Sequence, residues 1–353
     1  MKQYWKSLDG LRAIAVGIVM LAHVIGWPHF TGGIGVDIFF VLSGFLITGI
    51  LSGEFQRYGS ISRKNFYIRR LLRLSPCLVA CVLLFVILSL VSLGSVRMDI
   101  FIISLTYTSN FARALFGYDL QHMGHCWSLA IEEQYYLVWP LAIVALERHL
   151  ETNLNKFLVL LSFALALALY RAAMVGTFGA ERIYFGLDTH MDGLVLGSSL
   201  SYLVQFLSSI EDRKALDVFF KRVSRIALPI SILITLGLMF LSWYSPWMGR
   251  LGFTLAAMAA CVVVLDLVAS PFSLFRNLLE NRVLTYCGKI SYGLYLYHYP
   301  IYYFVNDAFR PLEWVYRVPI KVLSTFAIAS LSYHLLEKPI LSLKKHFEHE
   351  KRN

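Results

Sequence analysis

The sequence predicts an all-α polytopic membrane protein with about ten transmembrane helices and one re-entrant or interfacial helix. Of its 353 residues, 58% are hydrophobic and only 15% are charged, and the mean hydropathy is +0.62. This composition is outside the range of soluble globular proteins. The apolar residues also gather in runs of about 20, the length that a helix needs to cross the hydrocarbon layer.

The apolar runs are interpreted as spans in chain order. They cover approximately residues 8–28, 35–53, 76–94, 127–147, 156–175, 188–208, 226–244, 251–270, 288–306 and 318–337. The first run is not read as a signal peptide, because it carries Arg12 and His23 and is followed at once by a second run. Residues 99–118 are only half apolar and are predicted to form the re-entrant or interfacial helix on the outer side. We expect one membrane domain over residues 1–353.

The net charge of +10 is attributed to cytoplasmic loops rather than to nucleic-acid binding. Lys and Arg gather in the segments that face the cytoplasm when the amino terminus is inside, above all 54–75 and 209–225. We therefore expect a multi-pass protein with both termini in the cytoplasm. The five cysteines show no CxxC pair and no metal-ligand spacing, so neither a metal nor a required disulfide is expected.

Two residues of the first span, Arg12 and His23, are costly to place in lipid. Eleven residues of helix turn through about 1100° and rise roughly 16 Å, so both side chains are predicted to lie on one stripe. Arg12 is expected where the helix leaves the cytoplasm, paired with Asp9 and suited to a phosphate. His23 is expected well inside the hydrocarbon layer. Both also suit structural roles, Arg12 by reaching lipid headgroups and His23 by hydrogen bonding within a bundle.

Two later stretches carry charged residues at helical spacing. Arg70 and Arg73 lie one helical turn apart just before Pro76, where they can clamp a polyanion or serve as ordinary positive-inside anchors. In HCWSLAIEEQYYLVWP, Ser128 and Glu132 share a helix face. Glu132 suits either a structural hydrogen bond to a neighbouring helix or a catalytic or acceptor-orienting role.

Other polar residues have two interpretations each. Asp37 opens the second span and either orients His23 or is an amino-terminal residue favoured by the helix dipole. Ser43 and Gly44 indicate close helix packing rather than a nucleophile. His298 lies among tyrosines that suit packing or an aromatic vestibule for a sugar. Weaker candidates are His122, His125, Asp188, His190 and Asp192.

In their order along nearly the full chain, these stretches resemble the acyltransferase family 3 membrane proteins. The family's motif of an arginine, ten residues and a histidine falls on Arg12 and His23. Its arginine, two residues, arginine motif falls on Arg70 and Arg73. Its WSL-x-x-E motif falls on residues 127–132.

The resemblance implies an O-acyltransferase of the polysaccharide or O-antigen acetylase type. Such an enzyme moves an acyl group, in particular acetyl, from cytoplasmic acyl-CoA to a hydroxyl of a lipopolysaccharide or other saccharide outside a bacterial inner membrane. Arg12, Arg70 and Arg73 would then bind the phosphates of acyl-CoA. His23 would be general base or acyl carrier, acting with Arg12 and Glu132. The supporting residues would be Asp37, Ser128 and His298.

The partners implied are a saccharide or lipid-linked glycan acceptor and membrane lipids, and neither a metal nor nucleic acid. Some members of the family carry a fused SGNH domain; we expect none here, so transfer is expected to be direct or to use a separate periplasmic transferase. The competing interpretation is a secondary transporter or flippase for a lipid-linked sugar, which would also need many spans and intramembrane charges.

Overall fold

The computed structural model describes residues 4–26 and 31–347. In these ranges the secondary structure is helical, apart from one isolated bridge between Val175 and Phe178. Both chain ends, predicted to be cytoplasmic, lie outside the described residues, as does the end of the first expected span. The helices that are long and apolar enough to cross a membrane confirm the all-α polytopic class. Within the described ranges there are eight: Lys6–Ile25, Gly33–Tyr58, Arg63–Val91, Cys126–His149, Asn153–Met174, Arg213–Met239, Met248–Ala269 and Trp314–Ser342.

The other two expected spans are helices of a different kind. Residues 188–208 correspond mainly to α10 (Asp192–Ser208), which has 17 residues and is buried along most of its length. Residues 288–306 correspond mainly to α16 (Ser291–Ala308), which is rich in tyrosine and contains Pro300. Short helices with polar or aromatic faces are typical of elements packed inside a bundle rather than of helices that face lipid. They therefore differ from the other eight in length or composition.

The half-apolar stretch 99–118 forms two short helices joined by a turn, α4 (Met98–Leu105) and α5 (Ser109–Phe116). Each has 8 residues and so a length of about 12 Å. Tyr107, between them, has a left-handed φ of 54°. Neither helix is long enough to span a bilayer.

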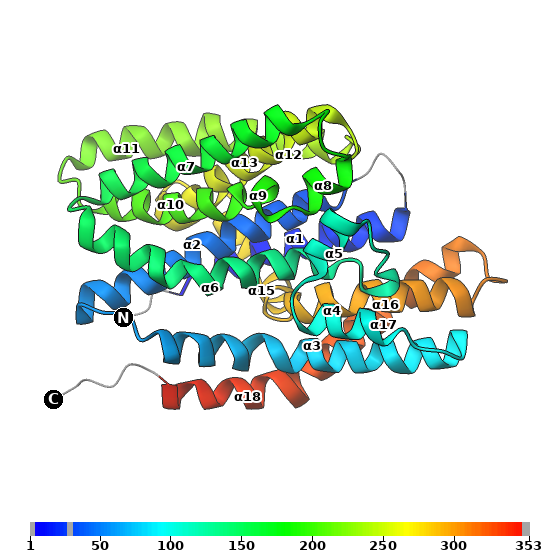
Figure 1. Ribbon diagram of the computed structural model, residues 1–353. Helices are drawn as coiled ribbons and strands as arrows, with labels where there is room; N and C mark the ends of the chain where they lie inside the picture. The colour runs from blue at the N-terminus through cyan, green and yellow to red at the C-terminus, as the bar shows by residue number, and fades with distance from the viewer. Residues whose placement is uncertain (1–3, 27–30, 348–353) are drawn as a thin grey trace. The chain divides into compact units, whose positions relative to one another are not determined.

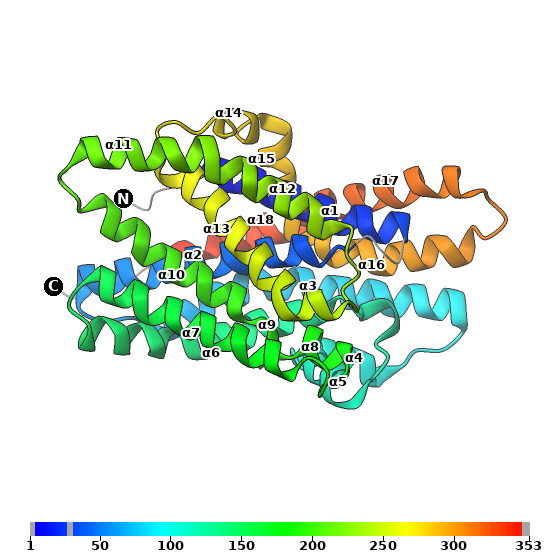
Figure 2. The same cartoon turned by 90° about the horizontal axis from the view of Figure 1, so that it is seen from above.

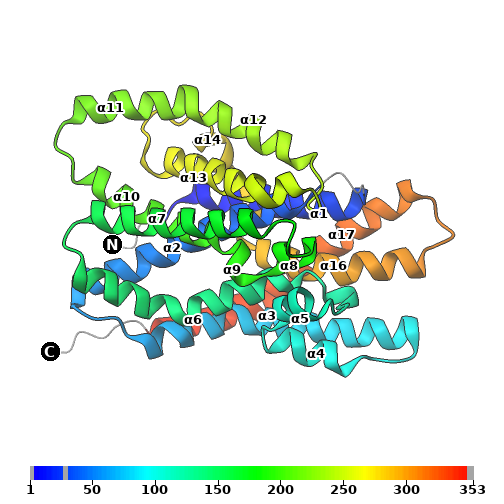
Figure 3. The same ribbon diagram turned by 45° about the horizontal axis from the view of Figure 1, so that its top comes forward.

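The chain divides into two compact units, of which the first comprises residues 1–60 and 131–289. In this unit α10 packs against α2 (Gly33–Tyr58) and α7 (Asn153–Met174), as Figure 3 shows. Figure 2 shows that α11, η2 and α12 form one nearly continuous helix. The other elements of the unit are α1 (Lys6–Ile25), most of α6 (Cys126–His149), α8 (Ala180–Phe185), α9 (Leu187–His190), α11 (Arg213–Arg222), η2 (Val223–Ala227), α12 (Leu228–Met239), η3 (Met248–Gly252), α13 (Phe253–Ala269), α14 (Arg276–Leu279) and α15 (Arg282–Lys289).

Glycines let the helices of the first unit approach closely. A Cβ added at Gly44 of α2 would lie 1.9 Å from the carbonyl oxygen of Leu194 on α10. A Cβ at Gly197 of α10 would lie 2.1 Å from the carbonyl oxygen of Val41. The two backbones are therefore in direct contact, which is the packing expected of small residues in membrane helices.

The second unit comprises residues 61–130 and 290–353. In it α16 packs against α3 (Arg63–Leu93) and α17 (Trp314–Ser332); α3, α16 and α17 can be followed in Figure 1. The hydroxyl of Tyr292 on α16 donates to the carbonyl of Leu74 on α3 at 3.0 Å. The remaining elements are α4, α5, η1 (Gln121–Met123), the first residues of α6, η4 (Tyr333–Glu337), α18 (Lys338–Ser342) and η5 (Leu343–Phe347).

The expected loop 54–75 is wrong over most of its length, because α2 continues to Tyr58 and α3 begins at Arg63. Pro76 lies well inside this helix rather than at its first turn. The basic residues before Pro76 are therefore carried on a rigid helical extension of the third span.

Candidate functional site

His23 lies in the last turn of α1, which ends at Ile25. Gly26 stops the helix with a left-handed φ of 64°, a conformation that glycine adopts without strain. The imidazole is thus near the carboxyl-terminal end of α1, and its expected place well inside the hydrocarbon layer stays a prediction. The residue is exposed.

A hydrogen bond within α1 orients the His23 ring. Nδ1 of His23 lies 2.8 Å from the carbonyl oxygen of Val19, one turn earlier. A carbonyl oxygen only accepts, so Nδ1 carries the proton and, in the neutral imidazole, Nε2 carries the lone pair. This is the tautomer that a general base needs if Nε2 is to take a proton from a substrate.

Arg12 is held by Asp9, as the spacing predicted. One guanidinium nitrogen of Arg12 lies 3.0 Å from Oδ1 of Asp9, with the Arg12 side chain 20% exposed. The hydroxyl of Tyr4 donates to the other carboxylate oxygen. Since Arg12 retains four further donor hydrogens, it can pair with Asp9 and still contact an anionic ligand.

Close backbone contacts fix this end of α1. A Cβ at Gly10 would lie 2.1 Å from the carbonyl oxygen of Leu279, and one at Gly288 would lie 1.8 Å from that of Asp9. The elements that follow α13, namely α14 and α15, therefore lie directly against the turn of α1 that carries Arg12.

Glu132 is hydrogen-bonded to Ser43, whose hydroxyl donates to Oε1 at 2.7 Å. Farther along the same two helices, Trp139 donates to Thr48 at 2.8 Å. From the first pair to the second, the residue number rises on both helices, from Ser43 to Thr48 on α2 and from Glu132 to Trp139 on α6. The two helices therefore run parallel. The interpretation of Ser43 as a packing residue missed this contact, because nothing in the sequence relates positions 89 residues apart.

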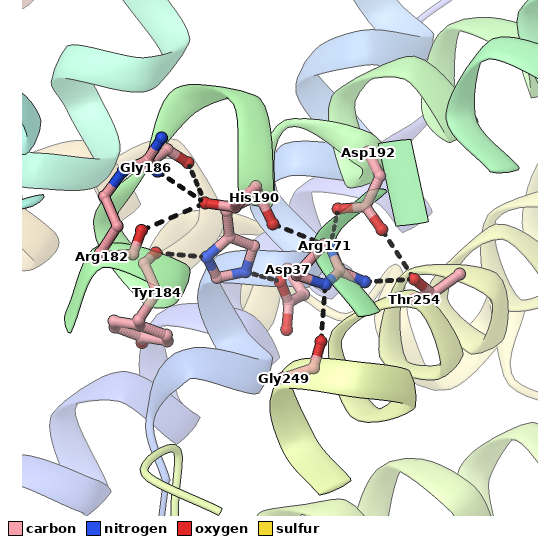
Figure 4. A network of polar contacts seen from close by, with 10 residues as sticks. Asp37, Arg171, Arg182, Tyr184, Gly186, His190, Asp192, Gly249 and Thr254 are labelled. Carbon is pink, nitrogen blue, oxygen red and sulfur yellow. Dashed lines mark hydrogen bonds and ion pairs between the residues drawn. The ribbon is translucent and has the colours of Figure 1, made fainter. Parts of the chain in front are cut away.

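Asp37 is bonded to His190, and the proposed contact of Asp37 with His23 is not among the contacts described (Figure 4). Nε2 of His190 lies 2.9 Å from Oδ1 of Asp37, and Nδ1 lies 2.7 Å from the carbonyl oxygen of Tyr184. All three side chains are buried. Both ring nitrogens of His190 are therefore engaged within the protein, which suits a structural pair rather than a base that acts on a substrate.

Arg171 lies beside this pair and was missed by the sequence reasoning (Figure 4). Its guanidinium is fully buried and lies 2.7 Å from Oδ1 of Asp192. It also donates to the carbonyl of Gly249 at 2.8 Å and to the hydroxyl of Thr254. The guanidinium of Arg171, which lies on α7, thus connects this helix to α10, η3 and α13. The signal that was available is the charge itself, because an arginine in an apolar run requires a partner.

In the second unit, Ser128 and His298 are both linked to Tyr295. The hydroxyls of Ser128 and Tyr295 are 2.6 Å apart. Nδ1 of His298 donates to the carbonyl of Tyr295 at 2.5 Å. His298 is fully buried and lies edge-on to the ring of His125, with ring centroids 5.5 Å apart. These residues form a buried polar and aromatic cluster on α16 and the start of α6.

Arg70 and Arg73 lie on α3 and are partly exposed. The guanidinium carbon of Arg70 lies 5.9 Å from the centroid of the Phe66 ring. Arg69, next to them, donates to the carbonyl of Phe347 at 2.7 Å. The predicted sharing of one helix face holds for Arg70 and Arg73, because both lie within the regular part of α3.

The predicted residues thus fall into two sets, each described within its own unit. The first unit contains Arg12, His23, Asp37 and Glu132. The second contains Arg70, Arg73, Ser128 and His298. Among the residues that the structure describes, no group of three or more His, Cys, Asp or Glu is arranged to hold a metal ion.

Comparison with known proteins gives the relatives of the chain. An acyltransferase domain model matches residues 5–334. The peptidoglycan O-acetyltransferase OatA of Listeria monocytogenes is 34% identical, over 96% of this chain and 56% of its own length. The putative peptidoglycan O-acetyltransferase YrhL of Bacillus subtilis is 33% identical, over 96% and 55%. The O-acetyltransferase OatA of Staphylococcus aureus is 32% identical, over 96% and 57%.

The chain spans a little over half the length of these curated relatives. No solved structure matches it. Because the acyltransferase domain model covers nearly the whole chain, and the sequence motifs lie within the matched region, the protein belongs to the acyltransferase family 3 membrane proteins.

Proposed function

We propose that the protein transfers an acetyl group from cytoplasmic acetyl-CoA to a hydroxyl of a cell-surface or lipid-linked saccharide. The family supports acyl transfer, and the names of three relatives support an acetyl group and, for two of them, a peptidoglycan acceptor. A glycan of the peptidoglycan type is therefore our first choice of acceptor, ahead of lipopolysaccharide. The protein would lie in the bacterial cell membrane with both termini in the cytoplasm, and would act directly or through a separate transferase.

The observation that carries the proposal is the hydrogen bond from Nδ1 of His23 to Val19. With the proton on Nδ1, Nε2 can take the proton of the acceptor hydroxyl as its oxygen attacks the thioester carbonyl carbon. The carbon–sulfur bond then breaks, and the thiolate of coenzyme A takes the proton back from His23. The ester is formed, and the imidazole returns to its neutral form. An acyl-imidazole on His23 is the covalent variant of the same reaction.

The donor would be bound through its phosphates by Arg12, Arg70 and Arg73. Guanidinium groups match phosphate oxygens in geometry and charge. Arg12 and His23 are separated along α1 by roughly 16 Å, which suits a donor with its phosphates at one end and its thioester at the other.

Glu132 would act next to the acceptor, because it is the carboxylate in the WSL-x-x-E motif and is held by Ser43 at 2.7 Å. Glu132→Gln keeps an oxygen that accepts this hydrogen bond but removes the charge. We expect it to lower kcat at least tenfold with little change in donor affinity. Unchanged kcat would leave Glu132 a structural residue.

The decisive experiment uses the full chain in detergent, acetyl-CoA and a soluble peptidoglycan fragment as acceptor, with release of free coenzyme A as the readout. His23→Ala and His23→Gln are expected to bind acetyl-CoA normally but to lose acceptor-dependent release. Glutamine can replace the hydrogen bond but cannot accept a proton at neutral pH. The matched control is His149→Gln, an exposed histidine at the end of α6.

Near wild-type turnover in His23→Gln would exclude His23 as the base. If the wild-type chain releases no coenzyme A with any glycan but moves a lipid-linked sugar across a vesicle membrane, the protein is a transporter rather than an acyltransferase.

A further inference from the structure

Lys321 of α17 is a buried cation in the second unit. Its side chain is 3% exposed, although it lies within a candidate membrane span. Its ammonium lies over the ring of Tyr302 on α16, 5.5 Å from the centroid. Among residues 4–26 and 31–347, no carboxylate pairs with it. An uncompensated buried charge is costly, so this arrangement requires an explanation.

Three hydrogen-bond donors next to Lys321 also lack partners in the described structure. They are Nε of Arg317, one turn before Lys321, the hydroxyl of Thr325, one turn after it, and the hydroxyl of Tyr302. Thr325 is fully buried and Tyr302 is 3% exposed. Each such group lowers stability when it is buried without an acceptor. Three donor atoms on the turns around Lys321 and on the neighbouring Tyr302 therefore lack an acceptor in the part of the chain that the structure describes.

The position of these groups along α17 indicates the kind of ligand. The helix begins at Trp314, and Trp314 and Tyr316 are 54% and 60% exposed. Exposed aromatic residues at the end of a span are typical of the membrane–water boundary. Arg317 lies at this level and Lys321 about 6 Å deeper, which is the depth of lipid phosphates and the first part of the acyl chains.

One flank of α17 is apolar and exposed, as is typical of a helix that faces lipid. Val322, Leu323 and Phe326 are exposed at 38%, 68% and 38%. A long lysine side chain on such a helix would normally extend toward water, whereas Lys321 is turned inward over Tyr302. A phosphate on a lipid can reach this place from the bilayer, where lipid is always present at high local concentration.

We propose that Arg317, Lys321 and Tyr302 form a binding site for the phosphate of a lipid. The guanidinium of Arg317 and the ammonium of Lys321 supply the charge, and the Tyr302 hydroxyl supplies a neutral donor. Thr325 lies one turn deeper and adds a donor on the inner side. The phosphate can belong to a bilayer phospholipid or to a polyprenyl lipid that carries a glycan.

The test measures lipid binding to the purified full chain by native mass spectrometry and thermal unfolding in a neutral detergent. The probes are phosphatidic acid against diacylglycerol, and polyprenyl phosphate against the matching polyprenol. We expect both phosphate lipids, or one of them, to bind wild type and raise its melting temperature, and their neutral counterparts to have no effect. The pair that responds identifies the source of the phosphate.

Lys321→Gln is expected to weaken phosphate-lipid binding at least tenfold, and Lys321→Arg to retain most of it. The matched control is Arg310→Gln, which removes a 77% exposed cation shortly before the start of α17. Lys321→Met tests folding separately, because removing an unpaired buried charge should leave the lipid-free protein as stable as wild type or more stable.

Equal binding of phosphate lipids to wild type and Lys321→Gln would overturn the proposal, as would equal binding of the neutral lipids. Binding of a soluble uronic-acid oligosaccharide in place of phosphate lipids would assign the site to a carboxylated glycan instead. A lower melting temperature of lipid-free Lys321→Met would show that Lys321 acts through its contact with Tyr302, which also overturns the proposal.

Discussion

Gly288 and Asp9 are in direct backbone contact: a Cβ at Gly288 would lie 1.8 Å from the carbonyl oxygen of Asp9. Asp9 in turn holds Arg12 at 3.0 Å. The position of a proposed phosphate-binding guanidinium therefore depends on a glycine more than 270 residues later in the chain. No helical periodicity or local motif could indicate this dependence.

Gly288→Ala is expected to destabilise the protein, because the new methyl group must push α15 away from α1. Overpacking of this kind typically costs about 1–3 kcal/mol. The melting temperature should fall, and acetyl-CoA affinity should fall with it as Asp9 and Arg12 move. Gly17→Ala is the control, since a Cβ at Gly17 meets nothing within 4 Å and alanine favours helix. Equal melting temperatures of the two variants would show that α15 can move away from α1 without a loss of stability, which would contradict the prediction.

The sequence predicted what depends on spacing within one helix. The common stripe of Arg12 and His23 and the pairing of Arg12 with Asp9 follow from helical geometry. The partner of Asp37 does not, because His190 lies 153 residues away. The two local alternatives considered for Asp37 both lay near it in the chain, and neither included this contact. The tautomer of His23 could also be inferred from the sequence, because a histidine in a helix can donate to the carbonyl one turn before it.

Arg171 shows a second limit of sequence reasoning. It lies in the apolar run 156–175, where one arginine has little effect on mean hydropathy, and its partner Asp192 ranked only as a weak candidate. The chain buries both groups because the four elements around them supply enough acceptors and donors. A charged residue in a span indicates that it has a partner, but only the fold identifies the partner residue.

Arg171→Met is expected to lower the free energy of unfolding by about 3–5 kcal/mol, because it leaves Asp192 buried and unpaired. Adding Asp192→Leu should recover part of this loss, since the double variant has no unpaired charge. Thermal unfolding of the two single variants and the double variant measures the coupling. Arg182→Gln is the control: its ion pair with Asp188 is partly exposed, and such pairs contribute only about 0–1 kcal/mol. Additive effects would mean that the two residues act independently.

His122, which lies in η1 outside the spanning helices, is expected to make stability depend on pH. Partial burial between the rings of Phe85 and Tyr303, with centroids at 5.9 and 4.9 Å, lowers its pKa below the ordinary value of 6.5. The carboxylates of Asp307 and Asp119 raise this pKa, but by less. The unfolded chain therefore binds a proton at a higher pH than the folded protein does. This contribution to stability is present above pH 6.5 and is lost as the pH falls through the lower pKa of the folded state.

The melting temperature of wild type should accordingly fall between about pH 7.5 and about pH 5.5. His122→Phe should fall less over the same range, because it keeps the aromatic packing and cannot be protonated. The exposed His149→Gln serves as the control and should follow wild type. Parallel curves for wild type and His122→Phe would assign the pH dependence to other groups.

Arg70 and Arg73 distinguish donor binding from membrane anchoring. Both lie on the part of α3 that precedes Pro76, and Arg70 packs against the Phe66 ring at 5.9 Å. If they bind the phosphates of acyl-CoA, Arg70→Ala and Arg73→Ala should each weaken acetyl-CoA binding about tenfold, as loss of a charge-assisted contact does. Isothermal titration calorimetry of the purified full chain measures this affinity.

The control is Arg63→Ala, which removes an exposed arginine at the start of α3 and should leave the affinity for acetyl-CoA unchanged. If all three variants bind acetyl-CoA as wild type does, Arg70 and Arg73 are positive-inside anchors, and the phosphates must be bound elsewhere.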